Sequence, residues 1–143
     1  LVWFGLTFIF IVLYESGIRT TNDFLTLISC MFGAFISLIA GQILKRIFNR
    51  PRPEAAITQH RALVETPQDG SFPSTHTSTS VALALGLILA GHMLAPYIVI
   101  WSAGVAFSRY YLGVHYPSDI AAGALLGLVC GAFDYSSVVS AIL

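Results

Sequence analysis

The sequence predicts an all-α protein, a polytopic bundle of transmembrane helices. Hydrophobic residues make up 56% of the 143-residue chain and charged residues only 10%, and the mean hydropathy is +0.79. A chain with so little charge cannot cover a water-facing surface of ordinary size. It also contains long runs without a charged side chain, as helices that cross about 30 Å of hydrocarbon do. We therefore expect the lipid bilayer to surround most of the molecule.

The first apolar segment covers residues 1–13 and is short for a crossing. The sequence does not begin with Met, which is consistent with a missing N-terminal helix. A secretory signal is the alternative interpretation, but a basic start and a small-residue cleavage pattern before Glu15 are lacking. Residues 24–44 are uncharged and match the roughly 20 residues that a crossing needs. They form the clearest predicted span.

Two antiparallel helices are predicted next, over residues 77–93 and 96–111. The sequence carries no charged side chain over residues 77–108, which is long enough for two crossings. Gly91 and Pro96 interrupt this run and suit a tight connection.

The last predicted helix covers residues 120–133 and begins near Pro117, whose fixed φ suits a first helical turn. With the segment at residues 1–13, the chain then has five crossings. The stretch of residues 48–72 is too long and polar for a simple turn, and loops of that length are usually functional or disordered. We interpret it as a lid or entry loop within a single membrane-embedded domain that spans residues 1–143.

An antiparallel arrangement brings three polar motifs to one side of the membrane. The first motif follows residues 24–44, the second begins the next helix, and the third joins the last two helices. Their side chains are Lys45, Arg52, Ser74, Thr75, His76, Arg109, His115 and Asp119. The opposite side receives Arg19, His92 and Asp134. The sequence therefore predicts one polar site at one end of an apolar bundle.

Small residues recur at four-residue spacing along these helices. The series are Gly33, Ser37 and Gly41; Ser74, Ser78, Ala82, Gly86 and Ala90; and Asp119, Gly123, Gly127 and Gly131. In membranes such ridges let helix backbones approach closely. The alternative is that Gly and Ala are simply common in membrane helices. Cys30 and Cys130 lie inside predicted spans, where we expect free, buried thiols.

The motif side chains match the needs of phosphoryl transfer, which are cations around the phosphate oxygens, an in-line nucleophile and an acid for the leaving oxygen. Lys45, Arg52 and Arg109 supply positive charge, and Arg can hold two phosphate oxygens at once. Ser74 precedes an apolar helix, whose first backbone N–H groups can bind an anion. Taken alone, however, Ser74 is also a preferred helix cap, and Lys45 can be an anchor at the membrane boundary.

Two histidines complete this chemistry. His76 and His115 offer an acid and a nucleophile. Asp119 lies four residues beyond His115, close enough to accept its ring N–H and leave the other nitrogen free for attack. The same three side chains also allow a metal site with two His and one carboxylate, although the neighbouring cations would repel a divalent ion.

The spacing Lys-x6-Arg-Pro, then Pro-Ser-x-His, then Ser-Arg-x5-His-x3-Asp resembles the three-part signature of the type 2 phosphatidic acid phosphatase superfamily. The resemblance extends from Lys45 to Asp119 and implies a helical bundle, usually of six spans in the membrane members. It also implies catalysis without metal or cofactor. One position departs from the commonest signature, because Thr75 stands where Gly is usual. A β-branched residue narrows the backbone options there, so we expect a modified pocket with retained activity.

The resemblance assigns a role to each motif residue. Phosphate would be held by Lys45, Arg52, Ser74, Thr75 and Arg109. His115 would attack phosphorus to give a phosphohistidine, Asp119 would orient it, and His76 would protonate the leaving group and later activate water.

We therefore expect an integral-membrane, metal-independent phosphatase for a lipid phosphate or polyprenyl diphosphate, with no cofactor and no nucleic-acid partner. Arg50 lies at the same face and is a candidate contact for a second phosphate or a headgroup. The alternatives are a lipid phosphotransferase on the same scaffold and a non-catalytic anion-binding bundle. Basic residues favour a cytoplasmic site, whereas the resemblance implies an extracytoplasmic one, which we adopt.

Overall fold

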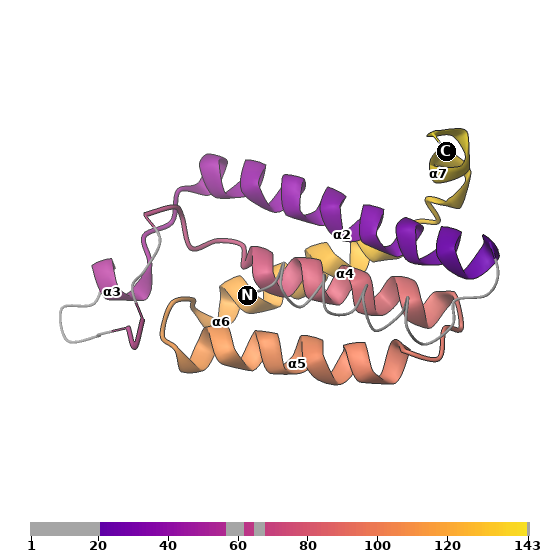
Figure 1. Cartoon of the computed structure of the whole chain (residues 1–143). Coiled ribbons are helices and arrows are strands. Elements are labelled where there is room, and N and C mark those ends of the chain that lie inside the picture. The colour runs from indigo at the N-terminus through magenta and orange to yellow at the C-terminus, as the bar shows by residue number, and fades with distance from the viewer. Residues whose placement is uncertain (1–20, 57–61, 65–67, 143) are drawn as a thin grey trace.

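The computed structural model describes residues 21–56, 62–64 and 68–142. These residues form an all-α structure of long helices that run side by side, with two short helices outside them (Figure 1). The long helices are α2 (Thr21–Phe48), α4 (Thr75–Leu89), α5 (Ala95–Tyr111) and α6 (Pro117–Gly131). The short ones are α3 (Pro53–Ala56) and α7 (Ser136–Ile142). The segment predicted at residues 1–13 lies outside the described residues.

Helix α2 contains the predicted span of residues 24–44 and continues beyond it to Phe48. Lys45 and Arg46 fall in its last turn, where positive charge is favourable because the carbonyl ends of the helix are partly negative. Asn49 then takes a φ of 39°, a left-handed conformation that Asn tolerates and that ends helices. The first motif, which begins at Lys45, is therefore helical as far as Phe48.

The predicted pair of helices is present with shifted ends. Helix α4 ends at Leu89, earlier than expected, and Gly91 turns the chain with a φ of 63°. His92 also belongs to this turn, where its Nδ1 accepts a hydrogen bond of 3.2 Å from the Leu94 N–H. Helix α6 begins at Pro117, as predicted. The sequence did not indicate α7.

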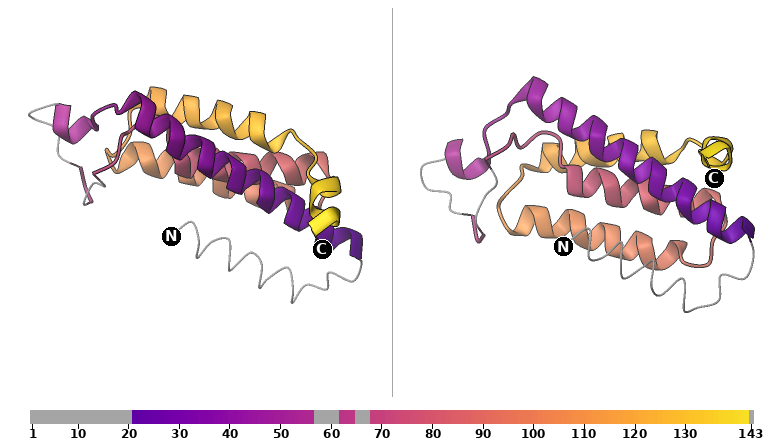
Figure 2. Two further views of the ribbon diagram at one scale, coloured as in Figure 1. Left: turned by 90° about the horizontal axis from the view of Figure 1, so that it is seen from above. Right: turned by 45° about the horizontal axis from the view of Figure 1, so that its top comes forward.

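Helix α4 lies at the centre, where it packs against α2, α5 and α6 (Figure 2). Apolar side chains such as Leu83 and Leu87 are buried in the core. Among the described helices, α2 alone is long and apolar enough to cross a membrane by the criteria of length and composition. Helices α4 and α6 are apolar but shorter.

The small-residue ridges form the contact between α4 and α6. A Cβ atom added to Gly123 would lie 2.5 Å from the Ser74 carbonyl oxygen, and one added to Gly131 would lie 2.5 Å from that of Ala82. Gly127 faces the Ser78 carbonyl oxygen just as closely. The two backbones therefore touch from Gly123 to Gly131, as predicted for small residues in a tightly packed bundle.

Part of the predicted lid lies outside the described residues. In the remainder, α3 is a single turn, and two backbone hydrogen bonds tie the segment down. The Leu63 N–H donates to the Leu112 carbonyl at 3.1 Å, and the Ser71 N–H donates to the Arg50 carbonyl at 2.9 Å. The second bond closes the segment just before α4, so it fixes the chain that enters the site.

Candidate active site

The three motifs meet at the end of the bundle that carries α3 in Figure 1. Helices α2 and α5 end here, and α4 and α6 begin here, as the antiparallel arrangement predicts. Most of the motif side chains are buried, with exposed fractions of 4% for Lys45, 6% for Arg52, 0% for Ser74, 4% for Thr75, 4% for His115 and 0% for Asp119. His76 and Arg109 are half-buried and are therefore the most accessible members of the group.

His115 lies on the connection between α5 and α6, and a backbone oxygen fixes its ring. The Nδ1 atom is 2.8 Å from the carbonyl oxygen of Ser71. A carbonyl oxygen can only accept, so Nδ1 carries the proton and donates it. The Nε2 atom then keeps its lone pair, which a nucleophile requires.

Asp119 is placed differently from the sequence-based expectation. Its Oδ2 lies 3.7 Å from His115 Nδ1, beyond hydrogen-bond distance, because the Ser71 carbonyl takes that position. Instead, Oδ2 accepts the Tyr116 N–H at 3.0 Å, and Oδ1 accepts from Arg50 Nη1 at 2.7 Å. Asp119 thus acts on His115 through its charge rather than through a direct hydrogen bond.

Arg50 is a partner of Asp119 that the sequence did not indicate. Its Nη1 also donates to Ser118 Oγ at 2.8 Å, and its Cζ lies 4.1 Å from the centre of the Tyr116 ring. The side chain is 38% exposed. Among the described residues, no acceptor is found for its Nε and Nη2.

The two cations of the first motif share one carboxylate, that of Asp69. Lys45 Nζ donates to Asp69 Oδ2 at 2.6 Å, and Arg52 Nη2 donates to Oδ1 at 2.6 Å. Arg52 Nε also reaches the Asp69 carbonyl at 3.1 Å, and Nη1 reaches the Val114 carbonyl at 2.9 Å. Asp69 belongs to none of the motifs, and no periodic pattern in the sequence marks it.

Ser74 occupies the N-cap position of α4, but its side chain makes no capping hydrogen bond. Its backbone N–H donates to the Asp119 carbonyl at 3.0 Å, which joins the second and third motifs. Its Oγ accepts from Thr77 Oγ1 at 3.0 Å, so the Ser74 hydroxyl proton stays available for another acceptor. The alternative that the Ser74 side chain serves only as a helix cap is therefore not supported, because its hydroxyl group makes no capping hydrogen bond.

The Thr75 side chain packs against α2 at Gly41. A Cβ atom added to Gly41 would lie 2.7 Å from Thr75 Cγ2, so the absent side chain at Gly41 makes room for this methyl group. His76 is the next residue of α4. Its ring feels the positive charge of three side chains, Arg109 most strongly, then Lys45 and Arg52. The site thus places three cations around one histidine.

The electrostatics of the site keep His115 neutral. Burial lowers its pKa to about 4 from the ordinary value of 6.5, and the charges of Arg52 and Lys45 act in the same direction. The Asp119 charge and the hydrogen bond to the Ser71 carbonyl oppose this shift. At neutral pH the ring is therefore uncharged, which leaves a lone pair on Nε2 for attack on an electrophile.

The metal alternative finds little support in this geometry. Both oxygens of Asp119 are taken by protein donors, Arg50 and the Tyr116 N–H. Within the described part of the chain, no three His, Cys, Asp or Glu side chains are grouped so that they could hold a metal ion. Lys45 and Arg52 instead both bind the carboxylate of Asp69.

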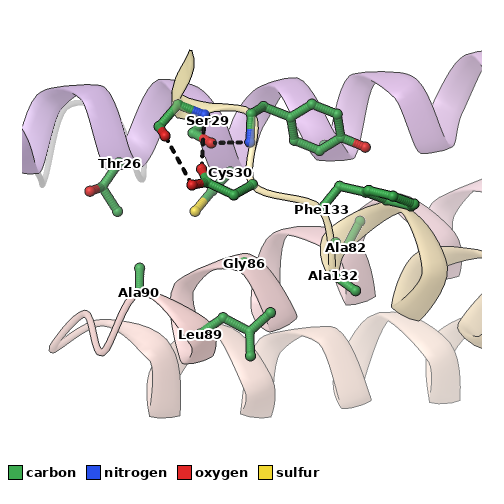
Figure 3. A pocket seen from close by; sticks show the side chains of 14 residues that line it. Thr26, Ser29, Cys30, Ala82, Gly86, Leu89, Ala90, Ala132 and Phe133 are labelled. Carbon is green, nitrogen blue, oxygen red and sulfur yellow. Dashed lines mark hydrogen bonds between the residues drawn. The ribbon is translucent and has the colours of Figure 1, made fainter. Parts of the chain in front are cut away.

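A separate cavity of about 370 Å³ lies at the other end of the bundle, between α2, α4 and the segment after α6 (Figure 3). Its polar groups bind one another. The Tyr135 N–H donates to Ser29 Oγ at 3.1 Å, and the Ser136 N–H donates to Asp134 Oδ1 at 2.8 Å. None of the motif side chains lines it, so the cavity has no part in the candidate active site.

Comparison with known proteins places this chain in a family that includes transmembrane members. The chain belongs to the PAP2 superfamily, whose sequence pattern matches residues 23–141. This confirms the resemblance drawn from the three motifs.

Two curated relatives and one solved structure illustrate the relationship. The decaprenylphosphoryl-5-phosphoribose phosphatase of Mycobacterium tuberculosis (strain ATCC 25618 / H37Rv) is 39% identical over 103 residues, which are 70% of this chain and 54% of that protein. The undecaprenyl-diphosphatase BcrC of Bacillus subtilis (strain 168) is 29% identical over 94 residues, 66% of this chain and 48% of that protein. The chain thus spans about half the length of these relatives.

The fold is also similar to a crystal structure described as the first transmembrane PAP2 type phosphatidylglycerolphosphate phosphatase from Bacillus subtilis. The TM-score is 0.63 at 25% sequence identity, and the match covers 97% of this chain and 68% of that one. The helical arrangement is therefore that of a transmembrane family member.

Proposed function

We propose that this chain is an integral-membrane phosphatase that hydrolyses a lipid phosphate or polyprenyl diphosphate through a phosphohistidine on His115, without a metal. One observation carries the proposal. The Ser71 carbonyl holds the proton on His115 Nδ1, so the lone pair is on Nε2, in a site where Lys45 and Arg52 are buried as cations. A buried neutral imidazole beside fixed positive charge is arranged to attack an anionic phosphoryl group.

In the first step, Nε2 of His115 forms a bond to phosphorus while the bond from phosphorus to the leaving oxygen breaks. His76 donates its proton to that oxygen. Lys45, Arg52 and Arg109 stabilise the charge that spreads over the three equatorial oxygens. The Ser74 hydroxyl and the first N–H groups of α4 complete the cradle, because the start of a helix favours an anion.

In the second step, a water molecule attacks phosphorus and gives up a proton to His76. The bond from phosphorus to Nε2 breaks, its electron pair returns to the ring, and phosphate leaves. The Asp119 charge stabilises the His115 ring while Nε2 carries the phosphoryl group, since that ring is then positively charged. Arg50 and the Tyr116 N–H hold the carboxylate in position.

The long helices are proposed to cross the membrane, with the site at one boundary. Helix α2 meets the length and composition of a crossing, and the exposed apolar side chains of α2 and α5 would face lipid. They include Phe35, Ile39, Ile43, Ile100 and Phe107. We place the site on the extracytoplasmic face, as the family resemblance implies, and regard the whole chain as one catalytic domain.

The favoured substrate class is a polyprenyl phosphate or diphosphate. The names of the relatives from Mycobacterium tuberculosis and Bacillus subtilis refer to decaprenyl and undecaprenyl compounds. Arg50 supports a diphosphate, because its Nη1 holds Asp119 and Ser118 while its Nε and Nη2 remain for a second phosphate. A charge-assisted hydrogen bond of this kind contributes roughly 1.5–3 kcal/mol.

Phosphate release by detergent-purified protein tests the proposal across undecaprenyl diphosphate, undecaprenyl phosphate, phosphatidylglycerol phosphate and phosphatidate. We expect release from at least one of them, with the polyprenyl compounds preferred, and loss of turnover in His115→Ala. His92→Ala is the matched control, since His92 lies in the turn at the other end of the bundle. Turnover by His115→Ala near the wild-type rate would sink the proposed mechanism.

A further inference from the structure

Asp69 connects the two cations that the first motif brings to the site. Its carboxylate accepts from Lys45 Nζ and from Arg52 Nη2, both at 2.6 Å. Its backbone carbonyl accepts from Arg52 Nε at 3.1 Å. One residue of the segment before α4 therefore makes three of the contacts that hold these cations, although it belongs to none of the three motifs.

The N–H groups of Arg52 and Lys45 that Asp69 leaves unused determine whether both cations can still bind an anion. Arg carries five N–H donors, and Arg52 gives Nε and one hydrogen of Nη2 to Asp69 and one hydrogen of Nη1 to the Val114 carbonyl. One N–H is left on each terminal nitrogen, so the guanidinium group keeps two donors for phosphate oxygens. Lys45 gives one of its three donors to Asp69 and keeps two. The carboxylate thus holds both cations without using up their capacity to bind an anion.

We propose that Asp69 is a positioning residue, which fixes the reach and orientation of Lys45 and Arg52 toward the phosphoryl group. The inference rests on the proposed function for the identity of the anion. The carboxylate bridges two cations that are 4% and 6% exposed and would otherwise repel each other at low dielectric. Its backbone contact to Nε then sets the plane of the guanidinium group.

The charge state of Asp69 agrees with this role. Partial burial raises the pKa of its carboxyl group, but the hydrogen bonds and charges of Lys45 and Arg52 outweigh burial and hold the pKa below its ordinary value. The carboxylate is therefore ionised at neutral pH. With 39% of its side chain exposed, Asp69 lies on the outer side of the cation pair, where solvent also stabilises its charge.

The opposite role would be that of a competitor, in which the carboxylate fills the place of phosphate and must leave before substrate binds. The two roles predict opposite effects of removing the charge. A positioning residue strengthens anion binding, so its loss weakens binding. A competitor weakens anion binding, so its loss strengthens it. The unused donors of Arg52 and Lys45 favour positioning.

The test is orthovanadate affinity, measured by binding to the purified full chain, so that it does not depend on turnover. We expect Asp69→Asn to weaken vanadate binding about tenfold or more, since one well-oriented charged contact is worth at least that factor. We expect KM to rise more than kcat falls, and Asp69→Glu to recover most of the lost affinity. Asp134→Asn, at the other end of the bundle, is the control and should bind as wild type does.

A double-mutant cycle separates positioning from a general structural effect. Because the Asp69 carboxylate holds both Lys45 and Arg52, the effect of Asp69→Asn on vanadate affinity must be smaller in a Lys45→Met background, where one of the two contacts is already lost. Unchanged or tighter binding by Asp69→Asn, an equal effect in both backgrounds, or a Glu variant as weak as the Asn variant would overturn the inference. Asp69→Ser replaces the Asn variant if thermal unfolding in detergent shows that the latter does not fold. If no lipid phosphate is hydrolysed but Asp69→Asn still weakens vanadate binding in a way that depends on Lys45, the result counts against the proposed function alone.

Discussion

Replacing Gly123 by Ala tests whether the backbone contact between α4 and α6 holds the active site together. The new Cβ would lie 2.5 Å from the Ser74 carbonyl oxygen, whereas ordinary contacts begin at 3.4 Å. The helices must therefore separate by about 0.9 Å at this point, the difference between these two distances. Ser74 and Asp119 are joined here by a backbone hydrogen bond, so the separation displaces α6 from the start of α4.

Two effects of opposite sign determine the magnitude. Ala is the better helix former by roughly 0.5–1 kcal/mol, but overpacking typically costs about 1–3 kcal/mol. We expect Gly123→Ala to lower the free energy of unfolding by about 1–2 kcal/mol. A displacement near 1 Å at a catalytic site can cost about 100-fold in rate, so kcat/KM is expected to fall by that order.

The assays are thermal unfolding in detergent and phosphate release by the same preparations. Gly104→Ala is the matched control, because a Cβ at this position in α5 meets nothing within 4 Å. It should leave kcat/KM unchanged and raise the unfolding temperature slightly through its helix propensity. A Gly123→Ala protein that is as stable and as active as the Gly104→Ala protein would refute the close-packing argument.

Three further predictions concern the site. Arg50→Gln should slow turnover of both lipid monophosphate and diphosphate, because Arg50 holds Asp119, and should lower kcat/KM for the diphosphate by about a further tenfold. An equal effect on both substrates refutes the contact with a second phosphate. The control is Arg46→Gln, since Arg46 is exposed. The His115 ring should become protonated only as the pH falls toward 4, because burial and the cations lower its pKa to about 4. NMR of phosphate-free protein measures this titration, with His115→Gln to assign the signal. A titration midpoint near pH 6.5 contradicts the prediction. EDTA should leave turnover nearly unchanged while orthovanadate inhibits as a transition-state mimic; loss in chelator with recovery on adding a divalent ion would favour a metal site instead.

The positions of the long helices could be predicted because they depend on local sequence. Uncharged runs, Gly91 and Pro117 mark where helices lie, turn and begin. The ridge through Gly123 and Gly127 could be predicted as well, since four-residue spacing keeps small residues on neighbouring turns of one helix. Antiparallel packing then brings the motifs together at one end without any knowledge of side-chain contacts.

The contacts inside the site could not be predicted from spacing. The proximity of His115 and Asp119 in sequence suggested a direct bond, but the acceptor is the Ser71 carbonyl. The contacts of Asp69 and Arg50 join positions far apart in sequence. They depend on how the segments flanking the motifs fold back, and such irregular segments have no periodicity from which a contact can be deduced.

The most direct test of the account is to trap the phosphorylated protein. Brief incubation with substrate labelled in the reacting phosphate, followed by denaturing quench and peptide mapping, should place an acid-labile, base-stable phosphoryl group on His115. The label should be absent from His115→Ala and should build up in His76→Ala when the substrate has a good leaving group, because that variant lacks the base for water. Label on another residue, or turnover by His115→Ala at the wild-type rate, would contradict the account.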